Sequence, residues 1–156
     1  MVWTAISVED IKALKQNRPM NLLYIIREII DIFYTNAVNN VSIEDAELTS
    51  VMKGCINLLT RFLPHIIDNK AYTDKILWNE DEIPYGVKLC EAILIMLFKQ
   101  GFAVRTLPQD NNTANTRGID QNVLWKNGIS TSGDVYNHYY QNFDANRIAL
   151  LRLLLI

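Results

Sequence analysis

The sequence predicts an all-α protein built from stacked helical hairpins, an α-solenoid-like segment with one long irregular loop. Two observations predict this class. Apolar residues recur at helical spacing in one segment after another, and prolines or Asn-rich turns separate those segments. No repeat of fixed length is present, so the stacking is indicated only by the succession of helices. With 156 residues and an apolar fraction of 49%, residues 1–156 are expected to form a single helical domain.

The first helix is expected to follow Ser7, a favoured N-cap residue with Asp10 three positions later. It should end before Pro19, because the residue preceding a proline avoids the helical region. Ile11 and Leu14 form its apolar side.

Residues 21–34 are the clearest helix. Its apolar residues fall at i, i+3, i+4, i+7, i+8 and i+11, namely Leu22, Ile25, Ile26, Ile29, Ile30 and Phe33. On the opposite face, Arg27 and Asp31 have the i, i+4 spacing of an ion pair. The segment "TNAVNN" at 35–40 is expected to turn the chain.

A third helix is expected to begin at Ser42, with Asp45 three residues later and further acidic residues in its first turn. Its apolar stripe is Leu48, Val51, Met52, Cys55, Leu58, Leu59, Phe62 and Leu63. Pro64 must kink or end this helix, because it lacks a backbone donor and clashes with the carbonyl of Thr60. The following turn should place Ile66 and Ile67 under the same core.

The next segment, "NKAYTDKILWNEDEIPYG" at 69–86, is polar and is predicted to be broken, with four probable anchors at Tyr72, Ile76, Leu77 and Trp78. Pro84 stands near the start of the following helix. The run from Ala92 to Phe98 is apolar on almost every side, which is typical of a central helix covered by neighbours. Gly101 is the expected C-terminal cap.

Residues 105–143 form the long, mostly irregular loop, in which Val123, Leu124 and Trp125 are expected to return to the core. Asp144 is the expected N-cap of the last helix. That helix is strongly apolar and lacks a stop signal before Ile156, so we expect either that the natural chain continues or that a partner covers this end.

Composition limits the classes of function. The formal net charge is −2, which argues against nucleic-acid binding and against general attraction to anionic lipid. Cys55 and Cys90 are expected to be free thiols in the core, with a disulfide as the alternative. The longest apolar run is too short to span a membrane, and no signal peptide opens the chain, so a cytoplasmic protein is expected.

Four features could carry chemistry, and each has a simpler structural interpretation. His65 and His138 lack metal-ligand spacing, and a small hydrolase that uses either one is the least favoured hypothesis. The acids of "NEDE" at 79–82 are expected on a solvated turn. The aromatic cluster "VYNHYYQNF" at 135–143 should pack the loop onto the helices. We therefore predict no catalytic, cofactor-binding or metal-binding residues, no small-molecule substrate, and no enzyme.

Five segments in order resemble the high-temperature-induced dauer formation protein family, which is related to dymeclin. They cover almost the whole chain and read "EDIKALKQNRPMNLLYI", "CINLLTRFLPHIIDN", "CEAILIMLFKQGFAV", "VLWKNGIS" and "NRIALLRLLL". The resemblance implies that Pro64 belongs to a family pattern. Since family members are several hundred residues long, it also implies that this chain corresponds to an N-terminal portion.

The resemblance further implies a helical, non-enzymatic protein, peripherally bound at the cytosolic face of Golgi membranes, with a role in secretory-cargo sorting and vesicle formation. Its partners would be other proteins. Some members carry an N-terminal glycine for myristoylation, whereas Val2 follows Met1 here, so that anchor is not expected. The alternative is a generic helical interaction module, or a truncated paralogue, with no trafficking role.

Overall fold

The computed structural model describes residues 6–39, 43, 45–78, 83–104 and 139–156. These residues contain seven helices and no strand, apart from one isolated bridge between Gln100 and Val104. The helices are α1 (Val8–Asn17), α2 (Pro19–Asn39), α3 (Ala46–Phe62), α4 (Pro64–Ile67), α5 (Lys70–Leu77), α6 (Tyr85–Leu97) and α8 (Tyr139–Leu154). The predicted all-α class is confirmed.

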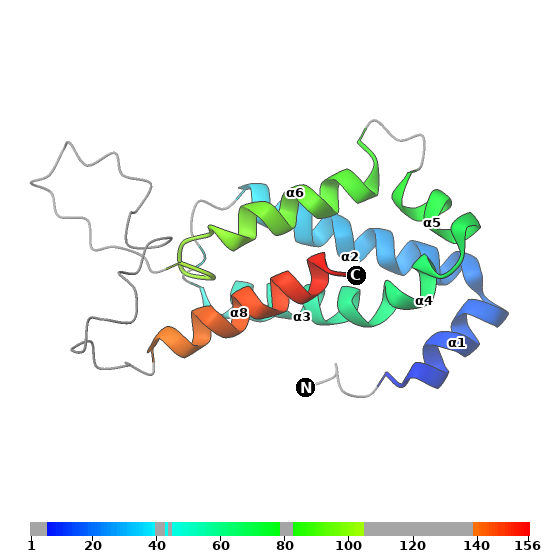
Figure 1. Ribbon diagram of the computed structural model, residues 1–156, viewed down its shortest axis with the longest axis horizontal. Helices are drawn as coiled ribbons and strands as arrows, with labels where there is room; N and C mark the ends of the chain where they lie inside the picture. The colour runs from blue at the N-terminus through cyan, green and yellow to red at the C-terminus, as the bar shows by residue number, and fades with distance from the viewer. Residues whose placement is uncertain (1–5, 40–42, 44, 79–82, 105–138) are drawn as a thin grey trace, which may run out of the picture.

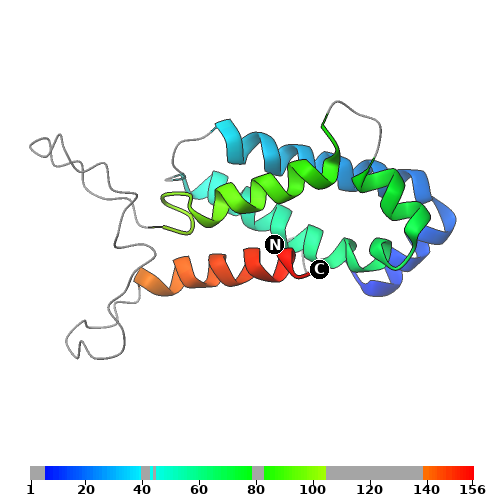
Figure 2. The ribbon, with the colours of Figure 1, turned by 45° about the horizontal axis from the view of Figure 1, so that its top comes forward.

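The four long helices form two antiparallel pairs that stack on each other (Figure 1). α2 and α3 make the rear pair, and α6 and α8 lie in front of them. α6 packs along α2 and α8 packs along α3, in each case with the two helices running in the same direction. The turned view shows the same two layers, with α1, α4 and α5 gathered at one end (Figure 2). This arrangement confirms the predicted stacking of helical pairs.

The core lies between the two pairs. From α2 it takes the predicted Leu22, Ile26, Ile29, Ile30 and Phe33, whereas Ile25 is exposed and Leu23 is buried in addition. α3, α6 and α8 supply most of the opposing side chains, namely Met52, Cys55, Ile56, Leu59, Phe62, Leu89, Ala92, Ile93, Met96, Leu150 and Leu153.

α2 is longer than predicted, because residues 35–39 continue the helix instead of turning the chain. Two interactions support this extension. Ala37 is fully buried and its carbonyl accepts a hydrogen bond from the Lys99 ammonium at 2.6 Å, while the Asn36 amide donates to the Ile32 carbonyl at 2.8 Å. A cation favours the C-terminal end of a helix, whose last carbonyls have no partner within the helix. Lys99 is distant in sequence, so local turn signals could not reveal it.

Helix starts differ from the sequence prediction at α3. Ser7 and Asp10 form the expected capping box of α1, and Pro19 separates α1 from α2 as expected. α3 begins after Asp45, whose carboxylate accepts from the Glu47 N–H at 2.9 Å, so the N-cap is Asp45 rather than a residue three positions earlier. Ser42 itself lies outside the described residues.

Pro64 breaks the helix as predicted. α3 ends at Phe62, and Pro64 is the first residue of the short helix α4. At this position a proline loses no helical hydrogen bond, because the N–H groups of the first turn have no partner within the helix. Ile66 is buried, but Ile67 is exposed, so only one of the two isoleucines joins the core.

Residues 70–77 were predicted to be broken, and that prediction is wrong, because they form α5. The Asn69 side chain accepts from the Ala71 N–H at 3.0 Å and begins the helix, and Ile76 anchors it in the core. Trp78 does not anchor the segment, since 60% of it is exposed.

α6 follows Pro84 as predicted, but it is not covered on every side, since Leu94 and Phe98 are each 53% exposed. Cys55 is buried, whereas Cys90 is exposed on α6, which corrects the prediction of two core thiols; both are free. Gly101 lies in the turn after α6 with φ +78°, rather than at its C-cap, Phe98.

The last helix begins earlier than predicted, unlike α3, which begins later. α8 starts at Tyr139, so residues 139–143 are helical rather than part of the irregular loop. Asp144 is therefore inside α8, where it pairs with Arg147 at 3.2 Å, and is not an N-cap. The rest of the predicted loop, 105–138 with Val123–Trp125, lies outside the described residues.

Candidate functional site

The sequence singled out few residues as chemical candidates, and the structure describes only part of them. His65 is in α4, half-buried, and its carbonyl rather than its ring makes the local contact. His138 and the acidic residues 79–82 lie outside the described part of the chain. Of the aromatic cluster 135–143, only the last five residues are described, as the first turn of α8.

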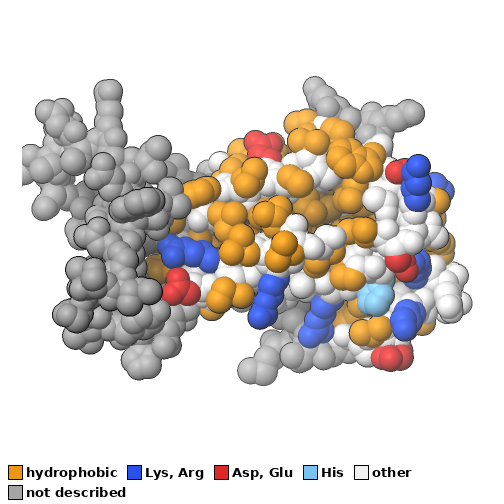
Figure 3. Space-filling view, viewed as in Figure 1, with side chains coloured by type: hydrophobic (Ala, Val, Ile, Leu, Met, Phe, Trp, Pro, Cys, Tyr) orange, Lys and Arg blue, Asp and Glu red, His pale blue; other side chains and the backbone are white. Residues whose placement is uncertain are grey.

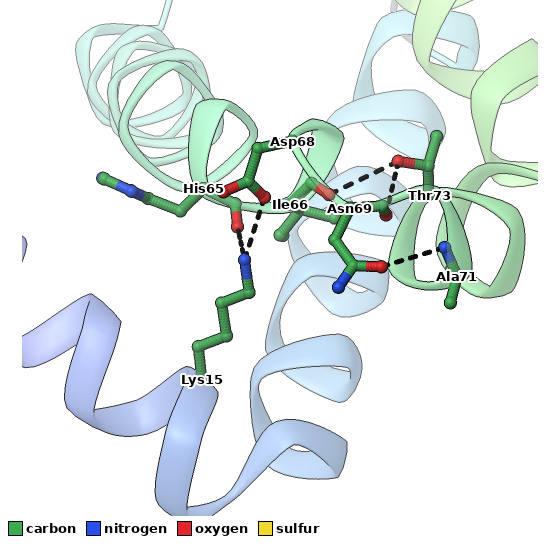
Figure 4. A network of polar contacts seen from close by, with 7 residues as sticks. All are labelled: Lys15, His65, Ile66, Asp68, Asn69, Ala71 and Thr73. Carbon is green, nitrogen blue, oxygen red and sulfur yellow. Dashed lines mark hydrogen bonds and ion pairs between the residues drawn. The ribbon is translucent and has the colours of Figure 1, made fainter.

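Around His65, a network of polar contacts ties three short helices together (Figure 4). The Lys15 ammonium of α1 donates to the His65 carbonyl at 2.5 Å and to the Asp68 carboxylate at 2.9 Å. Thr73 of α5 donates to the carbonyls of Ile66 and Asn69. The imidazole of His65 points away from Lys15 and Asp68. The network thus joins α1, α4 and α5 structurally, and the His65 ring has no part in it.

A second polar cluster joins α2 to α6. The Asp31 carboxylate accepts from the Tyr85 hydroxyl at 2.9 Å and from the Lys88 ammonium at 2.7 Å. Arg27 lies over the Tyr85 ring, with 5.4 Å between the guanidinium carbon and the ring centroid. Arg27 and Asp31 were expected to pair with each other along α2. Asp31 instead binds partners on α6, because α6 brings an ammonium and a hydroxyl within hydrogen-bond distance.

Beside this cluster, an open groove of about 750 Å³ runs between α2 and α5. Its lining residues are Met20, Asn21, Leu23, Tyr24 and Arg27 from α2 and Asp74 and Lys75 from α5. Leu23 is buried, while Met20 and Tyr24 are largely exposed, so the groove presents mostly apolar surface to solvent. The charge of Glu28 and a hydrogen bond to it raise the pKa of the Tyr24 phenol.

Arg27 is one of the charged residues of the groove, together with Asp74 and Lys75. One terminal nitrogen donates to the Lys75 carbonyl at 2.6 Å, which fixes the guanidinium between the two helices. Its Nε is buried and has no acceptor among the described residues. A buried donor without an acceptor is costly. Because the Nε is buried, an incoming oxygen could reach only other atoms of the guanidinium, since Arg27 as a whole is half-buried. The groove can therefore accept an apolar side chain against Met20 and Tyr24, beside the positively charged guanidinium of Arg27.

Sequence reasoning missed this groove. Met20 and Tyr24 are spaced by one helical turn, which hints at a shared apolar surface. However, residues 69–78 had been expected to lack a helix, and the groove exists only because α5 lies along α2.

The described residues contain neither a candidate membrane span nor a candidate metal site. No helix in 6–39, 45–78, 83–104 or 139–156 is long and apolar enough to cross a membrane. In the same part of the chain, no three His, Cys, Asp or Glu side chains are grouped so that they could hold a metal ion.

The chain is similar to a known protein family over almost its whole length. The sequence model of the family described as high-temperature-induced dauer-formation protein matches residues 2–156. A Hid-1 family protein of Schizosaccharomyces pombe is 26% identical over 164 aligned positions, which cover 99% of this chain. The chain spans only 19% of the length of that relative. No solved structure matches the chain.

Proposed function

Because the chain belongs to the high-temperature-induced dauer-formation protein family, we propose that it acts as a non-enzymatic scaffold in the Golgi and trans-Golgi secretory pathway. Its role there is in protein sorting and vesicle formation. The observation that carries the proposal is the family match across residues 2–156, together with the Golgi role that the family resemblance implies. Since the chain spans 19% of its relative, it contributes part of such a scaffold.

The structure supports a scaffold role through its surfaces. Polar contacts of Lys15 and Asp31 hold the helices in fixed positions, so the α2–α5 groove is a preformed surface. We propose that a segment of a partner protein binds in this groove, with an apolar side chain against Met20 and Tyr24 and an acceptor oxygen facing the charged guanidinium of Arg27. The net charge of −2 favours attachment to Golgi membranes through proteins rather than directly through anionic lipid.

Imaging of the tagged full chain tests the cellular role. We expect signal at the cytosolic face of the trans-Golgi, and slower release of secretory cargo when the protein is depleted. Diffuse signal together with normal secretion would contradict the proposal.

A charge placed in the groove tests the binding site separately. We expect Tyr24→Glu to reduce the Golgi signal and the recovery of partners at least about tenfold, because a carboxylate would then occupy apolar surface. Ile32→Glu is the matched control, since Ile32 is also on α2, is 44% exposed and does not line the groove. Equal loss from both variants would show that the groove is not the binding site.

The second candidate is a generic helical interaction module without a trafficking role. It is favoured by the small share of the relative that the chain covers, because a fragment can bind proteins without the activity of the whole. Affinity capture of the tagged chain distinguishes the two. Recovery of Golgi and vesicle proteins supports the scaffold, whereas recovery of only non-secretory partners supports the module.

A further inference from the structure

α6 and α8 are apolar on the side that faces solvent as well as on the side that faces the core. We call this exposed surface the outer face. It consists of Val87, Cys90 and Leu94 on α6 with the C-cap residue Phe98, and of Ile148, Leu151 and Leu154 on α8 with Leu155 directly after it. In the space-filling view, apolar side chains form a broad band over these two helices (Figure 3). A solvated helix normally carries polar residues on that side.

The outer-face residues follow helical spacing. On α6 they fall at i, i+3, i+7 and i+11, and on α8 Ile148, Leu151 and Leu155 fall at i, i+3 and i+7. Each helix therefore has a second continuous stripe, distinct from the buried stripe that includes Ile93 and Leu150. Isolated exposed apolar residues are ordinary, but two adjacent stripes form a contiguous patch, which marks an interaction surface.

The packing of the described helices indicates what kind of structure would cover the outer face. The pair α6 and α8 covers the pair α2 and α3 with corresponding helices side by side and parallel (Figure 1). In stacked helical proteins each unit contacts only its neighbours, so an inner unit needs an apolar stripe on both sides. α6 and α8 have the two-sided pattern of an inner unit.

We propose that the outer face is covered by a further antiparallel pair of amphipathic helices, stacked on α6 and α8 as they are stacked on α2 and α3. The Schizosaccharomyces pombe relative is long enough to supply such a pair, since the matched part is 19% of it. Arg152 is exposed on α8 next to Leu151, so the helix that lies along α8 should carry an acidic residue opposite it. This inference concerns packing and does not depend on a Golgi role.

The rate at which the Cys90 thiol is labelled shows whether the outer face is covered. It is exposed on the outer face, whereas Cys55, the other cysteine of the sequence, is buried, and burial raises the pKa of its thiol to about 11. Since the thiolate is the reactive form, a thiol reagent should label Cys90 rapidly and Cys55 only on unfolding. Cys90→Ser should remove the fast phase of labelling. Slow labelling of Cys90 in a monomeric chain would show that the outer face is not free, and would overturn the proposal.

A chimera supplies the proposed partner. In the chimera, this chain replaces the part of the Schizosaccharomyces pombe relative that it matches. Mass spectrometry of the peptide that contains Cys90 then measures how fast this cysteine is labelled. We expect at least about tenfold slower labelling than in the free chain, and Leu94→Glu should abolish the protection while Ile32→Glu leaves it. In the free chain, Leu94→Glu should leave the melting temperature unchanged within about 2 °C, because Leu94 is 53% exposed there and a carboxylate can stay in water.

Three further outcomes would overturn the proposal. In a folded chimera, labelling of Cys90 at the rate seen in the free chain would show that no helices cover the outer face. If the free chain forms a dimer whose Cys90 is protected, a second copy is the partner instead. A large loss of stability from Leu94→Glu in the free monomer would show that Leu94 is packed within the chain, and this measurement decides the matter even if the chimera does not fold.

Discussion

Gly101, in the turn that follows α6, has no room for a side chain. Its φ of +78° is unfavourable for other residues, and a Cβ placed there would lie 2.1 Å from the Ile43 carbonyl oxygen. The backbone of Ile43 cannot withdraw easily, because its N–H donates to the Gln100 carbonyl at 2.9 Å. The glycine thus permits the close approach that holds Ile43 against the end of α6.

We expect Gly101→Ala to lower the free energy of unfolding by more than about 2 kcal/mol, from backbone strain and the contact with Ile43. Urea unfolding would measure it. Gln100→Ala is the control, since that side chain is exposed and only its backbone contacts Ile43. Similar stability of Gly101→Ala and the wild type would contradict the described turn.

The surroundings of Lys99 change its titration, and with it the pH dependence of stability. Its ammonium is buried and donates to the Ala37 carbonyl, and burial lowers its pKa below the usual 10.5. Between the lowered pKa and 10.5, the unfolded chain binds more protons at this site than the folded chain. Stability therefore rises with pH in that interval, whereas the full cost of burying the charge is present below it.

The corresponding prediction compares wild type with Lys99→Met from about pH 8 up to pH 10.5. The wild type should gain stability relative to the variant as the pH rises, in urea unfolding at each pH. Subtracting the free energy of unfolding of the variant from that of the wild type removes the contribution of other groups that titrate in this range. A difference that stays constant, or that changes in the opposite direction, would show that Lys99 is not desolvated.

At the scale of elements, α1 and α2 were predictable where short-range signals agree. The capping box of Ser7, the break at Pro19 and the periodic stripe of α2 all lie within a few residues of the boundaries that they predict. Boundaries failed where a distant contact decides them, as with Lys99 at the end of α2. For α5, the Asn69 cap was present in the sequence, but few apolar residues follow it, so the polar character of the segment was misleading.

α5 should depend measurably on its cap. We expect Asn69→Ala to lower the free energy of unfolding by about 1 kcal/mol, because the Ala71 N–H loses its acceptor. Asn69→Asp should retain most of the stability, since a carboxylate also accepts and is favoured at a helix start. Guanidinium unfolding of the three proteins would measure this. A cost from Asp as large as that from Ala would exclude capping as the role of Asn69.

For the whole molecule, the sequence predicted stacked helical pairs but not which pairs, because the 3.6-residue pattern records burial and not the neighbour. The apolar run from Ala92 to Phe98 was expected to be covered on most sides. In this chain one side is open, at Leu94 and Phe98. The α2–α5 groove could not be predicted from the sequence either, because it forms only where α5 lies on α2. Surfaces between elements depend on contacts that no local pattern encodes.

The described stacking depends most on the position of α8, because α8 completes the second helical pair and forms half of the outer face. Leu150 is fully buried and its neighbour Leu151 is 47% exposed, although the two residues are identical. Only the rotation of α8 about its axis distinguishes them. A matched pair of substitutions therefore tests the stacking with the same chemistry at adjacent positions.

The measurement is thermal unfolding by far-UV circular dichroism, with mass in solution read in parallel, for the wild type, Leu150→Glu and Leu151→Glu. We expect a monomeric wild type with one sharp transition. Leu150→Glu should lower the melting temperature by at least about 10 °C, because a carboxylate enters the core, and Leu151→Glu by less than about 2 °C. Equal losses from both substitutions, or a larger loss from Leu151→Glu, would contradict the described stacking of α8 on α3.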